Sequence, residues 1–260
     1  MPVTTPAQAS KHFSSLRRFD AVVCDIDGCL GPETHAPMDA RALARIAAQN
    51  LRAATARDVP TVTLCSGRPQ PFAEAISRIM ANSTLPVICE MGVWLYDPSV
   101  GTYTRDPAIT GAHLLAVAAA TAWIEEHLIP TGVVIQPGKV ASISIWHPDL
   151  NHLMSLKPRL VEQCASHDWP FRISSSVNWV NLDLSIVSKA TGIERFIRTT
   201  GIPASRIAGI GDTIGDLAIA RSVGYFATPS NVEDELRPHA AYVSPHAEIE
   251  GVLDILRQLS

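Results

Sequence analysis

Four short apolar runs, each ending abruptly in polar residues, constrain this chain more than any other feature of its sequence. "AVVCDID" reaches Asp25, "PTVTLCSG" reaches Ser66, "LPVICE" reaches Glu90 and "RIAGIGD" reaches Asp212. Short apolar runs bounded by glycine or proline are typical of strands buried on both faces, as in a parallel sheet. Ligands bind at the carboxyl ends of the strands in such sheets, and these polar residues lie at those ends.

Helical patterns separate several of the runs. Asp39 precedes "ARALARIAAQNLRAATA" as a candidate N-cap, and "PFAEAISRIM" follows Pro69. Strands alternating with helices predict a doubly wound, Rossmann-like α/β sheet. The length of 260 residues suits one large α/β domain or two modest ones, and the hydrophobic content of 47% supports a packed core.

The stretch between the third and fourth runs has a different pattern. "VWLYDPSVGTYTR" and "GVVIQPGKVASISIW" are candidate hairpins, which turn at 97–101 and 137–138. Helices are expected at about 111–127 and 151–167, and strands in "PFRISS" and "WVNLDLSI". Hairpins flanking helices predict an α+β unit with an antiparallel sheet.

We therefore predict two domains. An α+β cap domain over 92–185 is inserted into an α/β core built from 1–91 and 186–260. The net charge of −4 and the lack of a basic block exclude a nucleic-acid partner. The most apolar stretch, 114–124, is too short to span a bilayer, and the first residues lack an apolar signal region. We expect a cytoplasmic protein without a membrane partner.

The cysteines are scattered and odd in number, which favours free thiols in a reducing cytosol. They are Cys24, Cys29, Cys65, Cys89 and Cys164. Several lie near the ends of predicted strands, where a small, weakly polar side chain packs well. A thiol nucleophile is the alternative, but no histidine stands where the motifs would pair it with Cys29.

Four carboxylates, one hydroxyl and one ammonium gather at the predicted strand ends. They belong to Asp25, Asp27, Ser66, Lys189, Asp212 and Asp216. The carboxylates would repel one another without a cation, and hard oxygen ligands suit Mg²⁺. The hydroxyl and the ammonium would then contact phosphate oxygens. Together these groups predict phosphoryl transfer with an aspartate as covalent nucleophile.

"DIDG", "TLCSGRP", Lys189 and "GDTIGD" resemble, in this order, the four motifs of the haloacid dehalogenase superfamily. The insert between the second and third motifs resembles the type II-B (C2) cap of Cof-type, sucrose-phosphatase and phosphoglycolate-phosphatase relatives. The resemblance extends over about 20–258. It implies a Mg²⁺-dependent phosphoric monoester hydrolase that acts on a small phosphorylated metabolite, such as a sugar or sugar-acid phosphate.

The resemblance also implies roles for the matching residues. Asp25 would attack phosphorus and form an aspartyl-phosphate, and Asp27 would protonate the leaving oxygen and then activate water. Ser66 and Lys189 would bind the phosphoryl oxygens.

The implied Mg²⁺ ligands are Asp25, the backbone carbonyl of Asp27, and Asp212. Asp216 would be a direct or outer ligand. Backbone N–H groups near Gly28 and Gly67 would assist in binding the phosphoryl group.

Four further residues are candidates for substrate binding: Arg68, Glu90, Lys139 and Asn178. A surface salt bridge is the alternative for Arg68, and hydrogen bonding at a sheet edge is the alternative for Asn178 and Asp183. Three positions depart from the family pattern: Cys29 stands where Thr is usual, Met91 where Asn is usual, and Gly215 where Asn is common. None of these departures removes a catalytic group.

Two other functions remain open at this point. A phosphotransferase or phosphomutase would use the same groups but needs more basic residues in the cap. The segment 92–185 carries only Arg105, Lys139, Lys157, Arg159 and Arg172, which favours hydrolysis. A non-enzymatic phosphate-binding protein, such as a phosphorelay receiver, would be about half as long and would lack the insert and "GDxxxD". The oligomeric state does not follow from the sequence.

Overall fold

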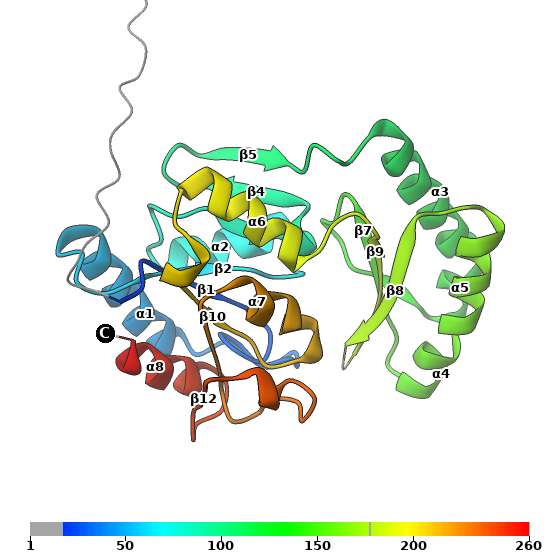
Figure 1. Ribbon diagram of the computed structural model, residues 1–260. Helices are drawn as coiled ribbons and strands as arrows, with labels where there is room; N and C mark the ends of the chain where they lie inside the picture. Colours follow the sequence, from blue (N-terminus) through cyan, green and yellow to red (C-terminus); the bar gives the residue numbers. More distant parts are fainter. Residues whose placement is uncertain (1–17, 177, 260) are drawn as a thin grey trace, which may run out of the picture.

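The computed structural model describes residues 18–176 and 178–259, and it has two lobes (Figure 1). The larger lobe contains a five-stranded sheet in the order β12-β11-β10-β1-β2, and all its paired strands are parallel. Its strands are β1 (Ala21–Cys24), β2 (Thr61–Leu64), β10 (Ile207–Ile210), β11 (Tyr225–Thr228) and β12 (Tyr242–Val243). The predicted doubly wound sheet is therefore confirmed.

Helices cover both faces of this sheet. They are α1 (Ala40–Thr55), α2 (Gln70–Ile79), α6 (Lys189–Thr200), α7 (Leu217–Ser222) and α8 (Glu248–Gln258). Alternate side chains of β1 point to opposite faces: Val22 and Cys24 pack with α1, α2 and α8, whereas Ala21 and Val23 pack with α6 and α7. This two-sided burial explains why the strand lacks an apolar–polar alternation.

The third apolar run forms β3 (Val87–Cys89), which differs from the other three. It pairs antiparallel with β4 (Trp94–Asp97), which pairs antiparallel with β5 (Thr102–Arg105). A single parallel bridge between Cys65 and Ile88 connects β3 to the end of β2. The predicted β4–β5 hairpin is confirmed, but it extends β3 in the larger lobe instead of joining the sheet of the smaller lobe.

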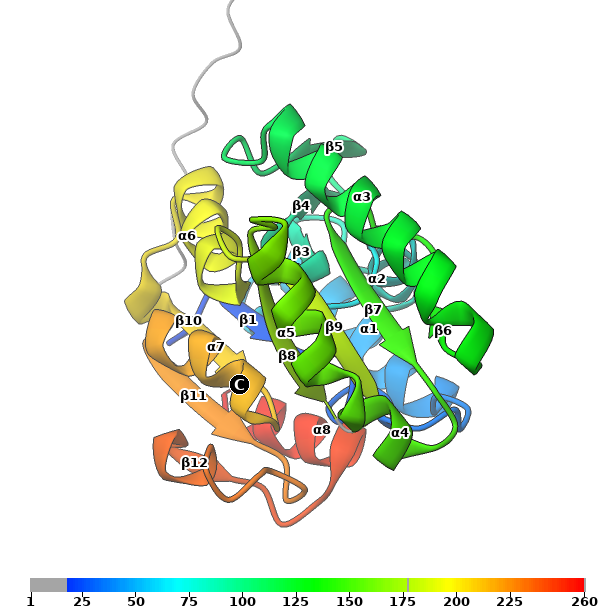
Figure 2. The ribbon, with the colours of Figure 1, turned by 90° about the vertical axis from the view of Figure 1, so that its right-hand side faces the viewer.

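The smaller lobe is an antiparallel sheet in the order β6-β7-β9-β8, with helices on its outer face (Figure 2). Its elements are α3 (Gly111–His127), β6 (Val134–Ile135), β7 (Ser142–Trp146), α4 (Leu150–Ser155), α5 (Lys157–Ser166), β8 (Phe171–Ser176) and β9 (Trp179–Leu184). We call this lobe, residues 111–184, the cap. The domain limits 92–185 stay a prediction.

One predicted helix is divided in the structure. The pattern over 151–167 predicts a single helix, but α4 and α5 are separated at Leu156. Pro158 lies in the first turn of α5, where its missing N–H is harmless, whereas the same residue inside a continuous helix would lose a hydrogen bond. The prediction of one continuous helix is therefore wrong.

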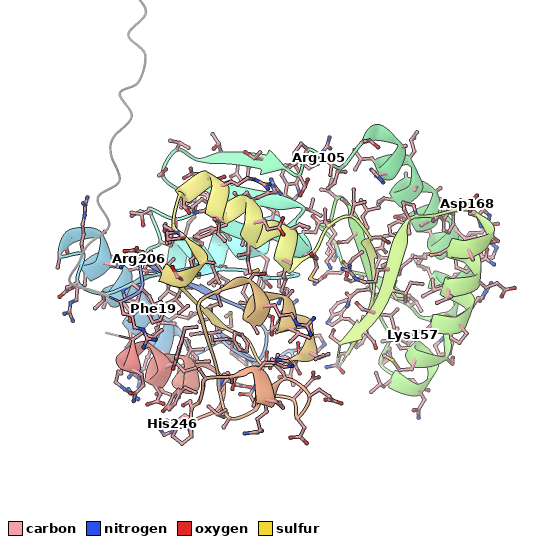
Figure 3. The ribbon with its side chains drawn as sticks, viewed as in Figure 1. Phe19, Arg105, Lys157, Asp168, Arg206 and His246 are labelled. Carbon is pink, nitrogen blue, oxygen red and sulfur yellow. The ribbon has the colours of Figure 1, made fainter. Side chains whose placement is uncertain are left out.

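Figure 3 shows the side chains of both lobes. Arg105 lies where the chain leaves β5 for the cap, and Lys157 and Asp168 lie on the far side of the cap. Among the described residues, no helix is both long and apolar enough to cross a membrane.

Candidate active site

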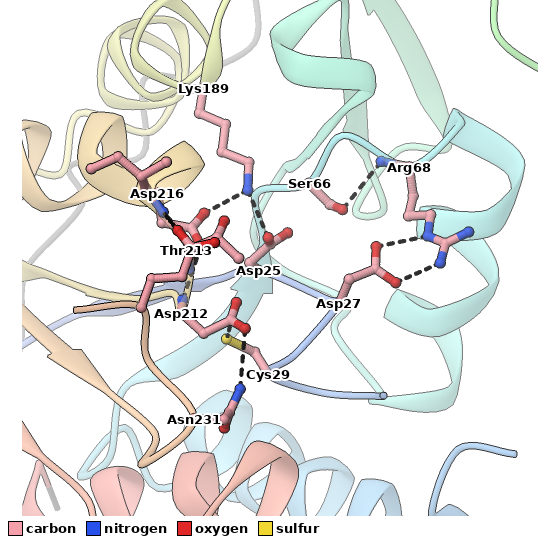
Figure 4. Close-up of polar contacts among 12 residues, drawn as sticks. Asp25, Asp27, Cys29, Ser66, Arg68, Lys189, Asp212, Thr213, Asp216 and Asn231 are labelled. Carbon is pink, nitrogen blue, oxygen red and sulfur yellow. Dashed lines mark hydrogen bonds and ion pairs between the residues drawn. The ribbon is translucent and has the colours of Figure 1, made fainter. Parts of the chain in front are cut away.

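The carboxyl ends of β1, β2 and β10 bring the predicted acidic and basic residues together (Figure 4). Asp25 follows β1, Ser66 follows β2, and Asp212 follows β10. Lys189 is the first residue of α6, whose N-cap Ser188 accepts a hydrogen bond from the Thr191 N–H. This local capping fixes where the helix begins, and so fixes where Lys189 enters the site.

Lys189 is the cation at the centre of the site. Its Nζ lies 2.7 Å from Asp25 Oδ2 and 2.6 Å from Asp216 Oδ1, and the lysine is only 4% exposed. Burial opposes the charge on this ammonium, but Asp216 and Asp25 raise its pKa well above the ordinary value. Lys189 therefore stays protonated and offsets part of the carboxylate charge.

Asp25, Asp212 and Asp216 form a buried acidic cluster, with one oxygen from each lying within 4.8 Å of the others. Burial, together with the charges of Asp216 and Asp25, raises the pKa of Asp212 to about 9. Asp25 Oδ1 is buried and has no hydrogen-bond partner among the described residues. The single ammonium group of Lys189 therefore does not balance the charge of three carboxylates.

Asp216 is the most tightly held member of the cluster. Its Oδ2 accepts hydrogen bonds from the Asp212 N–H at 3.0 Å and the Thr213 N–H at 3.3 Å. Gly211 makes this approach possible, because a Cβ there would lie 2.3 Å from Asp216 Cβ. Asp216 therefore shapes the loop that carries Asp212 as well as binding Lys189.

Gly28 is required by the same close packing. Its φ is +70°, and a Cβ on this residue would lie 1.8 Å from Asp212 Oδ2. The turn after Asp27 therefore packs directly on the Asp212 carboxylate.

Asp27 points away from the acidic cluster. Its two carboxylate oxygens accept hydrogen bonds from Arg68 Nε at 2.7 Å and from Arg68 Nη2 at 2.5 Å. The guanidinium also lies over the ring of Phe72, 5.0 Å from its centroid. This bidentate pair keeps the Asp27 carboxylate in one orientation.

A cavity of about 180 Å³ lies between this site and the cap sheet. The larger lobe contributes Asp25, Asp27, Ser66, Gly67, Arg68 and Lys189, and the cap contributes Lys139, Ser144, Asn178, Asn181 and Asp183. Met91 and Trp179 also line it. The face of the cap sheet opposite its helices is thus polar and lies over the site.

Like Gly28, the predicted substrate-binding residue Glu90 does not line this cavity. It is fully buried, and its Oε1 accepts hydrogen bonds from backbone N–H groups of the cap. Burial raises the pKa of its carboxyl group, and the N–H groups of Ala141 and Val140 oppose this shift. The substrate role of Glu90 stays a prediction.

The structure adds residues that the sequence analysis missed. Asn231 Nδ2 donates to the Gly28 carbonyl at 2.9 Å and to Asp212 Oδ2 at 3.1 Å. Glu233 accepts a hydrogen bond from the Ile214 N–H at 2.6 Å. Both follow β11, whose sequence "YFAT" is a fifth apolar run ending in polar residues. Applying the strand-end rule to this run would have found them.

The cysteines are all free and buried in the structure. Cys29 Sγ donates a weak hydrogen bond to Asp212 Oδ1 at 3.7 Å. Burial, Cys24 and the charge of Asp212 raise the pKa of the Cys29 thiol well above its ordinary value. A thiol held protonated in this way is a poor nucleophile.

We therefore expect Cys24→Ala and Cys29→Ala to keep kcat/KM within about tenfold of the unmodified protein, since neither removes a reacting group. Steady-state assays on the purified variants, with circular dichroism to verify the fold, check this expectation. Loss of turnover by about 10³-fold in a folded Cys29→Ala protein would instead identify a thiol nucleophile.

The raised pKa of Asp212 predicts a pH dependence of stability. Between the ordinary carboxyl pKa and about 9, folded Asp212 holds a proton that the unfolded chain releases. Stability of the metal-free protein should therefore fall as pH rises through this window. In EDTA, thermal melts between about pH 6 and about pH 8 should show a shallower decline for Asp212→Asn than for the unmodified protein. Parallel declines in the two proteins would show that Asp212 is not the group responsible.

Comparisons with known proteins agree with this arrangement. A family model described as haloacid dehalogenase-like hydrolase matches residues 138–256. A solved haloacid dehalogenase-like hydrolase from Bacteroides thetaiotaomicron superposes with a TM-score of 0.70 over 93% of this chain and 100% of its own, at 14% identity. This chain is similar to the haloacid dehalogenase-like hydrolases, in sequence over residues 138–256 and in fold over 93% of its length. The sequence-based recognition of the family is confirmed.

Two further proteins are similar to this chain, one over the fold and one over a short segment. The sucrose-phosphatase of Synechocystis sp. PCC6803, solved with sucrose and phosphate, has a TM-score of 0.66 over 94% of this chain and 98% of its own, at 15% identity. A phosphoglycolate phosphatase of Methanothrix thermoacetophila is 34% identical over 70 residues, which are 27% of this chain and 32% of that protein. This chain thus covers about a third of that curated relative's length.

Proposed function

We propose that this hydrolase is a Mg²⁺-dependent phosphatase that cleaves a small phosphorylated metabolite through an aspartyl-phosphate. The observation that carries the proposal is the position of Asp25. It lines the cavity, is paired with Lys189 and belongs to the acidic cluster, and its Oδ1 has no hydrogen-bond partner among the described residues.

The acidic cluster fits Mg²⁺. Its donors are carboxylate oxygens, which Mg²⁺ prefers, and the unpartnered Asp25 Oδ1 and the raised pKa of Asp212 both indicate missing positive charge. Asp25, Asp212 and Asp216 would hold the ion, together with the backbone carbonyl of Asp27. When bound, Mg²⁺ supplies positive charge that stabilises the phosphoryl group during transfer.

The chain's own residues then carry the two steps. An oxygen of Asp25 attacks phosphorus, the bond from phosphorus to the leaving oxygen breaks, and Asp27 gives that oxygen a proton. Water next attacks the aspartyl-phosphate, Asp27 takes a proton from this water, and Asp25 and inorganic phosphate are released. Both carboxylate oxygens of Asp27 accept hydrogen bonds from Arg68, so Asp27 must turn away from Arg68 before it can give a proton to the leaving oxygen.

The remaining groups suit binding. Lys189 and the Ser66 hydroxyl would bind the phosphoryl oxygens, helped by N–H groups near Gly28 and Gly67. Arg68, Lys139 and Asn178 lie in the cavity wall and would contact the leaving group. The hydroxyl- and amide-bearing cap wall supports a sugar or sugar-acid phosphate as substrate.

Hydrolysis is favoured over transfer between two phosphorylated sugars. Of the five basic side chains in the predicted cap, only Lys139 lines the cavity. Lys157 instead donates to Ser175 Oγ at 3.0 Å, and Arg159 lies over the Trp123 ring. A mutase would need a second phosphate site in this wall.

The proposal is tested by phosphate release from a panel of phosphorylated metabolites, in Mg²⁺ and in EDTA. We expect strong activity on one sugar or sugar-acid phosphate, and none after chelation. Phosphate release that persists in EDTA would contradict the metal requirement, and transfer of the group to a second sugar without release would support a phosphotransferase.

A further inference from the structure

Glu90 connects the two lobes through a buried carboxylate. It is 0% exposed, and its Oε1 accepts hydrogen bonds from the Val140 N–H at 2.8 Å, the Ala141 N–H at 2.7 Å and Ser142 Oγ at 3.1 Å. These donors lie about fifty residues away, at the start of cap strand β7. We call these four residues the clasp.

The backbone at Glu90 is strained and tied to the site. Glu90 and Met91 have φ values of 50° and 55°, which residues other than Gly, Asn and Asp rarely adopt. The Glu90 N–H donates to the Arg68 carbonyl at 2.9 Å, and the Met91 N–H donates to the Ser66 carbonyl at 3.1 Å. The turn that aims the carboxylate at the cap therefore also holds the 66–68 loop.

On the cap side, the clasp controls the position of Lys139. This residue directly precedes the two bound N–H groups, and its Nζ donates to Ser144 Oγ at 2.6 Å in the cavity wall. The preceding Gly138 packs over Pro69, since a Cβ there would lie 3.4 Å from Pro69 Cβ. The β6–β7 turn thus sits on the loop that carries Arg68.

Only one of the two Glu90 carboxylate oxygens is hydrogen-bonded in the clasp. Glu90 Oε2 is buried and has no hydrogen-bond partner among the described residues. Burying half a carboxylate unsatisfied costs free energy, and the bonds to Oε1 exist only while β7 lies against the larger lobe. Movement of the cap away from the core would break all three bonds together.

We propose that Glu90 is a positioning residue that couples closure of the cap to the 66–68 loop and delivers Lys139 into the cavity. Only the expected change in KM rests on the proposed phosphatase function. Glu90 itself does not contact the reacting atoms.

The test is amide hydrogen exchange of the full chain, followed by kinetics. In Glu90→Gln, peptides covering 138–146 should exchange about tenfold faster, because weakening these bonds favours the open cap. Peptides from α3 and β1 should be unchanged. Glu74→Gln is the matched control, since Glu74 accepts hydrogen bonds from Gln70 and Tyr103 within the larger lobe.

A second variant leaves the core untouched. Ser142→Ala removes one donor of the clasp and should raise exchange over 138–146 by a smaller factor. It keeps the proposal testable if Glu90→Gln does not fold.

The kinetic arm separates positioning from a structural role. KM for the metabolite substrate should rise about tenfold in Glu90→Gln, while kcat on a small aryl phosphate, which does not need the cap, stays unchanged. Unchanged exchange over 138–146, or faster exchange over the whole chain, would overturn the clasp. If amide exchange becomes faster only over 138–146, and the unmodified protein releases no phosphate from any substrate, the clasp would be supported and the proposed phosphatase function rejected.

Discussion

Asp25→Asn should lower phosphate release by at least about 10³-fold while the protein keeps its fold, because an amide cannot replace a carboxylate as nucleophile. Asn has the same shape as Asp, and its amide oxygen can face Lys189 Nζ as Asp25 Oδ2 does at 2.7 Å. The substitution also removes one charge from the acidic cluster, so the melting temperature should not fall. Activity assays and thermal melts of the same preparation measure both effects.

Asp168→Asn is the matched control for this variant. Asp168 is exposed on the far side of the cap (Figure 3), and its φ of 53° suits Asn as well as Asp. The control should turn over normally. Full activity in Asp25→Asn would reject the aspartyl-phosphate. Mass spectrometry that finds a phosphorylated protein in Asp27→Asn, treated with an aryl phosphate whose leaving group needs no proton from Asp27, would support it, since that variant lacks the base for the second step.

The convergence of Asp25, Ser66 and Asp212 was predictable from sequence because it follows from strand polarity. Three apolar runs form neighbouring parallel strands, so their carboxyl ends meet at one edge of the sheet. The start of α6 at Lys189 was predictable for a similar local reason, since Ser188 supplies its cap. These features depend on burial and capping, which a short stretch of sequence records.

Contacts between distant segments were not predictable in the same way. The bond from Glu90 to the cap and the bidentate pair of Asp27 with Arg68 depend on how the lobes and loops dock. The antiparallel pairing of β3 was also missed, because a buried edge strand has the same composition as a central one. A sequence pattern indicates which residues are buried, but it does not indicate which segment packs against them.

Lys189→Met should be the most destabilising single change at the site. It removes the cation that lies 2.7 Å from Asp25 and 2.6 Å from Asp216, and leaves three buried carboxyl groups without it. Breaking a buried ion pair by removing one partner costs about 3–5 kcal/mol in the free energy of unfolding. Urea unfolding in EDTA at neutral pH measures this loss, and turnover should be lost with it.

The physical cause can be separated from lost packing. If the cost is electrostatic, lowering the pH should restore much of the stability of Lys189→Met, because the carboxyl groups then take up protons. Adding Asp216→Asn should also restore part of it, since one charge is removed from the cluster. Lys157→Met, on the cap surface where Lys157 binds Ser175, should unfold like the unmodified protein. If Lys189→Met were as stable as that control at neutral pH, charge compensation by Lys189 would not be what holds the acidic cluster together.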